Sequence, residues 1–289
     1  MKDIFKNIET YPFYDFMKET PKKFQYSSYE SEIDFTGGDI SGGWSNDFHY
    51  KNLDTIKKHI KSRPDRVKKY KWVNDDGSIR WPKYNTNKFG FRTSLEYKNG
   101  TSIAIGCSYT FGLGVHEEHT WPYLLSKELG KDIINLGMCG GSMDSSYRIL
   151  KWYLGEYKPE YVFFLLPSVL RQELFYRREN NRIGTLKLMP GHSNRSSEDK
   201  SKVSDECLKN FYSLDDNIYL NFYKNLEAIR YLCDVNGVNL IEQLNHAMYN
   251  QNYVLDKNNI NFEDTPSFDS LHYGPEIHEL IMNDIKRLI

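Results

Sequence analysis

The apolar positions divide the chain into a patterned part and an irregular part. From residue 101 onward, short apolar runs alternate with longer stretches of mixed apolar and polar residues, separated by glycine, proline or polar turns. The apolar runs lie at residues 103–105, 133–136, 161–166 and 238–241, and the mixed stretches at 121–129, 144–154, 219–235 and 275–289. Short buried strands alternating with helices are typical of a parallel sheet with helices on both faces. The pattern therefore predicts a three-layer α/β/α sandwich with a central parallel sheet over residues 101–289.

The first 100 residues show no such alternation. Residues 57–69 are basic and are expected to be partly helical, with an interruption at Pro64. We expect residues 1–100 to form an irregular N-terminal extension that packs on the core formed by residues 101–289. Residues 190–208 are polar and nearly free of bulky apolar side chains, which predicts a loop inserted into that core.

Composition and charge exclude several classes of protein. With 39% hydrophobic and 15% aromatic residues, the chain has too much core material for a disordered protein. A net charge of −1 argues against a nucleic-acid partner. The sequence has neither a run of about 18 apolar residues nor an N-terminal apolar signal region, so we expect no membrane association and, by default, a cytoplasmic protein. The four cysteines are scattered, which argues against a disulfide framework or a cysteine-based zinc site.

Three segments place reactive chemistry where ligands of open α/β sheets bind, beyond the carboxyl ends of the strands. Ser108 follows the first predicted strand and can present its hydroxyl and its own amide to a pocket, or alternatively cap a helix. Asp269 and His272 can meet at a common point, where the histidine acts as a base and the aspartate fixes its tautomer. The alternative is a pair of surface residues. The glycines of residues 135–142 can aim backbone amides at an anion, or simply form a tight turn.

Together these segments resemble the SGNH (GDSL-type) hydrolase superfamily. The turn around Ser108 is similar to the nucleophile block of that family, with Cys107 where the name-giving aspartate usually stands. Residues 135–140 resemble the second block, and residues 269–272 resemble the last. A segment often found before the core of some relatives is similar to residues 87–92, so that the resemblance covers about residues 85–289.

The resemblance implies a flavodoxin-like sandwich, the SGNH hydrolase fold, and a specific set of site residues. Ser108, Asp269 and His272 would form a catalytic triad. The backbone N–H groups of Ser108 and Gly140 would form an oxyanion hole.

One block departs from the family pattern. After the strand at 161–166 the family usually supplies Gly-x-Asn-Asp, whose asparagine is the third oxyanion donor. Here the chain continues Pro167-Ser168-Val169-Leu170-Arg171. Ser168 or Arg171 could replace that donor, or the hole could have two donors. Loss of one donor typically costs about 10²–10³ in rate.

Other motifs are poorer candidates for chemistry. The pair His116 and His119 has a spacing of three, whereas the metalloprotease motif needs a spacing of four, so we expect surface residues. The glycines of residues 112–114 lack the third glycine of a dinucleotide fingerprint. We therefore expect no metal and no organic cofactor.

The residues and the resemblance together imply a serine esterase or deacylase for small acyl esters, acetyl esters above all. Carbohydrate esters are the preferred substrates, because the shallow sites of the family often serve sugars. Two alternatives stay open at this point. One is a non-catalytic carbohydrate-binding or structural protein on the same scaffold, and the other is an O-acyltransferase with the same triad.

Overall fold

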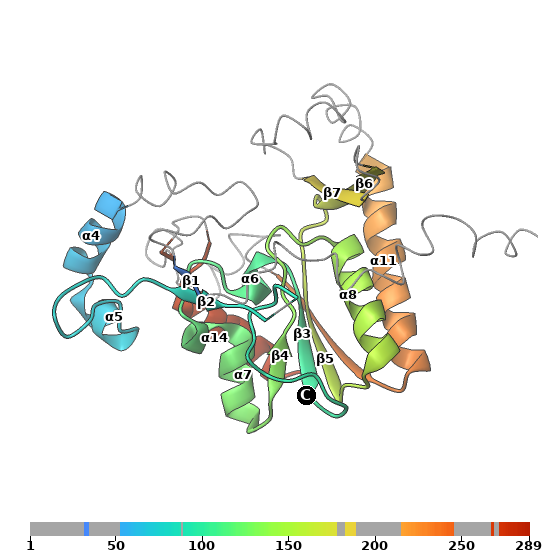
Figure 1. Cartoon of the computed structure of the whole chain (residues 1–289), viewed down its shortest axis with the longest axis horizontal. Coiled ribbons are helices and arrows are strands. Elements are labelled where there is room, and N and C mark those ends of the chain that lie inside the picture. Colours follow the sequence, from blue (N-terminus) through green and yellow to red (C-terminus); the bar gives the residue numbers. More distant parts are fainter. Residues whose placement is uncertain are drawn as a thin grey trace, which may run out of the picture.

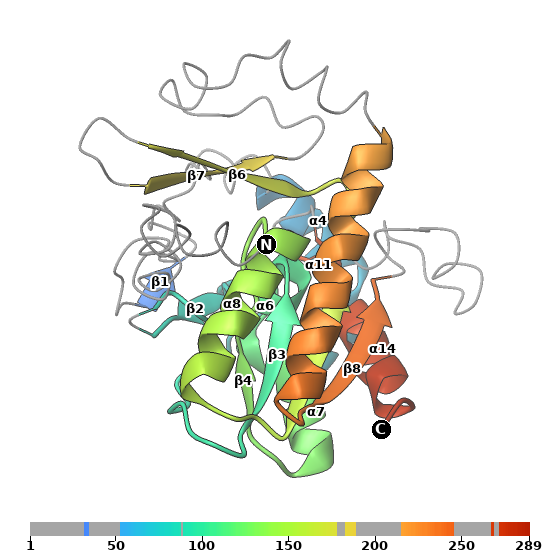
Figure 2. The ribbon, with the colours of Figure 1, turned by 90° about the vertical axis from the view of Figure 1, so that its right-hand side faces the viewer.

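A four-stranded parallel sheet forms the centre of the molecule (Figures 1 and 2). The computed structural model describes residues 32–34, 53–87, 89–177, 183–188, 215–245, 267–268 and 272–289. The strands of the sheet are β3 (Ser102–Gly106), β4 (Ile133–Asn135), β5 (Tyr161–Leu166) and β8 (Asn239–Leu244), arranged in the order β4-β3-β5-β8. In chain order this reads 2-1-3-4, the flavodoxin-like order, which places its binding edge where the carboxyl ends of β3 and β5 meet.

Helices cover both faces of the sheet, as Figure 2 shows. Helices α8 (Met143–Glu156) and α11 (Asp215–Val235) lie on one face, and α7 (Trp121–Leu129) and α14 (Pro275–Lys286) on the other. Side chains of a strand point alternately to the two faces. Accordingly, Ile103 and Ile105 pack with α8 and α11, whereas Ala104 packs with α7 and α14. The predicted three-layer α/β/α fold is confirmed.

Local signals in the sequence account for the helix ends near the sheet. Ser142 caps α8, because its hydroxyl accepts a hydrogen bond from the Ser145 amide and its own amide donates to the Ser145 hydroxyl. This reciprocal pair satisfies two amides that would otherwise lack acceptors. Helix α7 ends at Gly130, whose φ of 62° is a left-handed conformation that glycine adopts without strain.

The segment before the core contributes α4 (Leu53–Ser62), α5 (Pro64–Lys69) and the two-stranded antiparallel pair β1 (Glu32–Asp34) and β2 (Lys83–Asn85). Helix α5 begins at Pro64, the position expected to interrupt the basic stretch. Arg66 donates two hydrogen bonds to Glu276 of α14, at 2.6 and 2.9 Å. Its guanidinium also lies 4.3 Å from the ring of Trp72. The bonds to Glu276 connect the N-terminal segment to the last helix of the chain.

The structure adds an element that the apolar pattern did not predict. Strands β6 (Gln172–Arg177) and β7 (Ile183–Leu188) pair antiparallel outside the main sheet. A two-stranded hairpin does not need the continuous apolar run that marks a strand buried on both faces, so the pattern gave no signal for it. The boundaries of α11 and β8 also differ from the prediction, which placed them at 219–235 and 238–241. The predicted loop at 190–208 lies outside the described residues. Within the described part of the chain, none of the helices combines the length and apolar character that crossing a bilayer requires.

Candidate active site

Ser108 lies on a sharp turn at the carboxyl end of β3. Gly106 makes this turn possible, because its φ is 147° and a Cβ atom there would lie 2.6 Å from the carbonyl oxygen of Leu165 on β5. The N-cap of the short helix α6 (Ser108–Phe111) is Cys107, and Ser108 is the first helical residue. The alternative that Ser108 serves as a helix cap is therefore wrong.

The structure brings Ser108 and His272 together across 164 positions of sequence. His272 Nε2 lies 2.9 Å from Ser108 Oγ, and both side chains are buried. The ring of Tyr109 meets the His272 ring edge-on, with 5.2 Å between centroids, which restricts the orientation of the imidazole. This distance is within hydrogen-bond reach for a histidine that takes a proton from a serine. Asp269 lies outside the described residues, so its contact with His272 stays a prediction.

A second loop, which follows β4, is hydrogen-bonded to the turn that carries Ser108. The Met138 amide donates to the carbonyl oxygen of Gly106 at 3.0 Å. The buried Asn135 side chain donates to the Thr110 carbonyl of α6 at 2.8 Å and accepts from the Gly137 amide at 2.9 Å. This loop carries Gly140, which has a left-handed φ of 67°. The segments of Ser108 and Gly140 thus lie together at one edge of the sheet, while a role of the Gly140 amide remains a proposal.

Ser168 and Arg171 follow the neighbouring strand β5. They form one turn, in which the Arg171 amide donates to the Ser168 carbonyl at 3.0 Å. The Ser168 hydroxyl accepts a hydrogen bond from the Leu170 amide at 3.3 Å. Ser168 is half-buried and Arg171 is buried. Both remain predictions for the third oxyanion donor.

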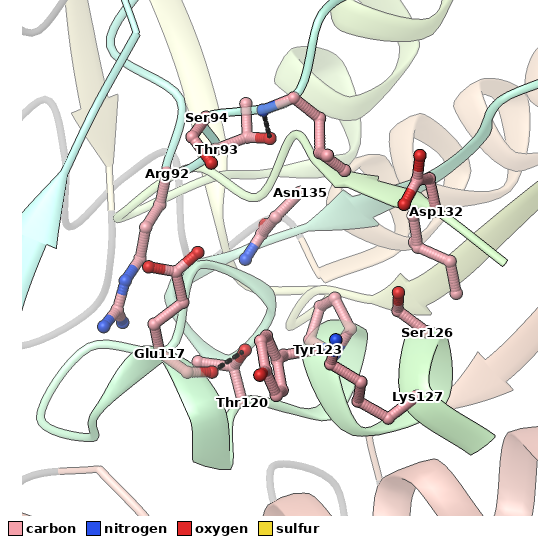
Figure 3. A pocket seen from close by; sticks show the side chains of 13 residues that line it. Arg92, Thr93, Ser94, Glu117, Thr120, Tyr123, Ser126, Lys127, Asp132 and Asn135 are labelled. Carbon is pink, nitrogen blue, oxygen red and sulfur yellow. Dashed lines mark hydrogen bonds between the residues drawn. The ribbon is translucent and has the colours of Figure 1, made fainter. Parts of the chain in front are cut away.

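Arg92 is a residue whose part in the site the sequence did not reveal. It is buried, and its guanidinium donates to the carbonyl oxygens of Gly112 (2.6 Å), Val115 (3.1 Å) and Phe111 (3.3 Å), which lie at the end of α6 and just after it. A fourth bond goes to the Lys83 carbonyl at 3.1 Å. Figure 3 shows Arg92 in the wall of a cavity of about 140 Å³, which Asn135 also lines. Arg92 therefore holds the far end of the helix that begins with Ser108.

A buried polar cluster fixes the segment after β5 to the start of α8. Asp144 accepts hydrogen bonds from the Glu173 amide at 3.2 Å and from the side chains of Asn221 (3.1 Å) and Asn225 (3.0 Å). Arg148 Nε donates to the Glu173 carboxylate at 3.0 Å. Burial raises the pKa of Glu173 to about 7, against the opposing effect of Arg148. The sequence held no pattern for this cluster, because its members come from three separate segments.

The expectation that His116 and His119 are surface residues is wrong for His116. Its ring is buried and meets the ring of Phe268 edge-on, with 5.4 Å between centroids. Burial lowers the pKa of His116 to about 3, so the imidazole is neutral at physiological pH. His119 is half-buried, and its Nε2 atom lies 3.2 Å from the Tyr70 carbonyl oxygen. In the described part of the chain, no group of three His, Cys, Asp or Glu side chains is arranged to hold a metal ion.

Comparison with known proteins finds solved structures of low similarity. No protein-family model and no curated protein matches the sequence. Solved structures do match. Among them are GDSL and SGNH hydrolases. A putative lipolytic protein of the G-D-S-L family from Desulfitobacterium hafniense is 17% identical, with 66% of this chain and 100% of that chain covered and a TM-score of 0.37. The psychrotrophic esterase EstA from a Pseudoalteromonas species is also 17% identical, with 66% and 96% covered and a TM-score of 0.36.

A third match is AlinE4, an SGNH-hydrolase family esterase, at 15% identity, with 67% of this chain and 98% of that chain covered and a TM-score of 0.27. At identities of 17% or less and TM-scores of 0.37 or less, the activity has to be argued from the residues of this chain.

Proposed function

We propose that this protein is a serine esterase that hydrolyses small acyl esters, acetyl esters of carbohydrate above all. The observation that carries the proposal is the 2.9 Å contact between His272 Nε2 and Ser108 Oγ at the carboxyl edge of a parallel sheet. A serine with a histidine base in hydrogen-bond reach is the arrangement that activates a hydroxyl as a nucleophile. No metal or organic cofactor enters the reaction.

In the proposed acylation step, Ser108 Oγ attacks the ester carbonyl carbon while His272 Nε2 takes the hydroxyl proton. The carbonyl π electrons move to oxygen and give a tetrahedral oxyanion. When this intermediate collapses, the bond to the leaving alcohol breaks and His272 returns the proton to that oxygen. The alcohol departs, and the acyl group remains on Ser108.

Deacylation repeats the sequence with water. His272 takes a proton from the attacking water, the second tetrahedral intermediate collapses, and the proton returns to Ser108 as the carboxylic acid leaves. Asp269 would orient His272 in both steps and stabilise the imidazolium.

The backbone supports an oxyanion site next to the serine. The Ser108 amide is the first of helix α6, so the helix itself provides no acceptor for it. The loop of Gly140 is hydrogen-bonded to the same turn, which supports its amide as the second donor. Ser168 and Arg171 are the alternatives for a third.

The test is covalent labelling with a fluorophosphonate probe, combined with hydrolysis of p-nitrophenyl acetate. We expect the wild type to be labelled and active, and Ser108→Ala to lose labelling and roughly 10⁴-fold or more in kcat. His272→Ala should lose activity to a similar extent, because serine and histidine act as one unit. Exposed Lys68→Ala is the matched control. A folded wild type that is neither labelled nor active would contradict the proposal and favour a non-catalytic binding scaffold. Transfer of the acetyl group to an added alcohol in preference to water would indicate an acyltransferase.

A further inference from the structure

A groove of about 560 Å³ lies between the segment that contains residues 74–85 and the loop before α7. Trp81, Asn74 and Asn85 line it, together with the ion pair of Arg80 and Glu118, whose charged atoms are 2.6 Å apart. This volume lies within the range of about 300–1,000 Å³ that is typical of clefts for small ligands. No step of the proposed reaction uses these residues.

Three contacts link the walls of the groove to the segments of Ser108 and His272. The Trp81 ring packs on the ring of Phe268, with 5.6 Å between centroids. The residue before Phe268 donates its amide to the His272 carbonyl at 3.1 Å. From the other side, Tyr84 of β2 stacks on Phe111, the last residue of the helix that begins with Ser108, at 5.5 Å. These contacts connect the walls of the groove to the two segments that carry Ser108 and His272.

The lining has the chemistry of a site for an uncharged polar ligand with a flat apolar face. Trp81 is half-buried and rests on the buried Phe268, which makes its ring a rigid platform. Asn74 and Asn85 are exposed amides that can both donate and accept hydrogen bonds. The two basic and two acidic side chains of the lining, Arg80 and Lys83 against Glu117 and Glu118, balance in charge. An ionic ligand therefore gains little there, whereas a sugar ring offers C–H groups to an aromatic face and hydroxyls to amides.

We propose that this groove binds the uncharged sugar units of an O-acylated oligosaccharide while its acyl group lies at Ser108. The proposal rests on the esterase function proposed above, and it assigns the choice of the alcohol part of the substrate to Trp81 and Asn85 of the N-terminal segment. The groove extends the acyl site by additional sugar units, so longer substrates gain contacts that a monosaccharide cannot make.

The experiment compares kcat/KM for mono-acetylated glucose, cellobiose and cellotriose with that for p-nitrophenyl acetate, which carries no sugar unit. In the wild type we expect kcat/KM to rise by about tenfold from the glucose to the cellotriose ester, as expected for an added aromatic contact. Trp81→Ala should lower the ratio of the cellotriose ester to p-nitrophenyl acetate by about tenfold, and Asn85→Ala by about threefold. Lys68→Ala, on an exposed face of the same N-terminal segment, should leave the ratio unchanged. Asn85 is exposed, so its variant keeps the test valid if Trp81→Ala misfolds.

The outcomes separate the two proposals. If the wild type shows no gain with sugar length, or if both variants keep the gain, the groove is not a sugar subsite. A higher kcat/KM for acetylated trigalacturonate than for the cellotriose ester would overturn the assignment to uncharged sugars. Absence of p-nitrophenyl acetate hydrolysis, or its persistence in Ser108→Ala, would instead defeat the esterase function itself.

Discussion

Single buried side chains fix the main chain around Ser108. Arg92 binds carbonyl oxygens at and after the end of α6, and Asn135 binds the Thr110 carbonyl within it. Both act on backbone groups, so the position of the serine hydroxyl depends on residues that do not touch it. In a reaction that depends on near-attack geometry, a misplacement of about 1 Å can cost about 10²-fold in rate.

Arg92→Lys tests this dependence. A lysine ammonium cannot serve several carbonyls in the planar arrangement of a guanidinium, so we expect kcat on p-nitrophenyl acetate to fall about tenfold to hundredfold while KM changes little. The control is Arg230→Lys, an exposed arginine of α11 that pairs with Glu242, for which kcat should not change. Unfolding curves are recorded in parallel. A lower stability of Arg92→Lys with unchanged kcat would show that Arg92 supports the fold alone.

The sequence predicted the Ser108–His272 pair but not the residues that hold its surroundings. Ser108 and His272 were predicted because their side-chain types suit acyl transfer and because they follow predicted strands or precede a predicted helix. Arg92 and Asn135 lie in segments that the resemblance covers, but their own roles were not predicted, because binding a backbone carbonyl leaves no pattern of residue types. The sequence also showed that the asparagine expected from the resemblance is absent after β5, but it gave no signal that chooses between Ser168 and Arg171 in its place.

At the scale of elements, the strands buried on both faces were the easiest to predict. β5 reads as a continuous apolar run because α8 and α11 cover one of its faces and α7 and α14 cover the other. The hairpin of β6 and β7 lies outside this sheet and was missed. Burial of the polar His116 was also missed, because the ring packing that buries it comes from Phe268, far away in the chain.

The contact between α14 and α7 depends on a neutral histidine. The Trp121 amide donates to His278 Nδ1 at 3.1 Å, and burial, with Arg92 and His272 nearby, lowers the pKa of His278 to about 3. The unfolded chain binds a proton at this residue near pH 6.5, whereas the folded chain does not. The contribution of His278 to the free energy of unfolding is therefore fully present above pH 6.5 and decreases as the pH falls below that value.

His278→Gln should reduce this pH dependence, because glutamine keeps a hydrogen-bond acceptor but does not titrate. For one histidine held neutral, the free energy of unfolding falls by about 1.4 kcal/mol between pH 7.5 and pH 5.5. We expect the loss in the variant to be smaller than in the wild type by about that amount, measured by urea unfolding at the two pH values. His116 titrates in the same direction, so part of the dependence remains. Equal losses in the two proteins would show that His278 is not held neutral.

At the scale of the whole molecule, side-chain hydrogen bonds connect the N-terminal segment to helix α14, the last helix of the chain. Arg66 pairs with Glu276 at the start of α14, and the Tyr70 hydroxyl lies 3.2 Å from the Glu279 carboxylate one turn later. Burial, with these two glutamates nearby, raises the pKa of Tyr70, so it remains a neutral hydrogen-bond donor. The side chains of the Arg66–Glu276 pair are only 8% and 20% exposed, which distinguishes it from the exposed ion pairs of the surface.

A double-mutant cycle of Arg66→Met and Glu276→Gln measures the coupling free energy of this ion pair. We expect a coupling free energy of about 1.5–3 kcal/mol, the range for hydrogen bonds to charged groups. The exposed pair Lys131–Glu160 is the matched control and should give a clearly smaller coupling, because water screens its charges. Both values come from urea unfolding. A coupling of Arg66 and Glu276 no larger than that of the control would show that apolar contacts hold the segment instead, such as the Trp72 ring on the Phe268 ring, with 4.3 Å between centroids.

The bonds of Arg92 have a practical consequence for handling the protein. Arg92 precedes every strand of the central sheet, yet it holds the far end of the helix that begins with Ser108. A chain whose segment before residue 101 has not docked would lack these bonds, and we expect Ser108 to be misplaced in it. Stoichiometric titration of Ser108 would then count fully assembled chains, and the labelled fraction of a preparation would serve as a measure of refolding yield.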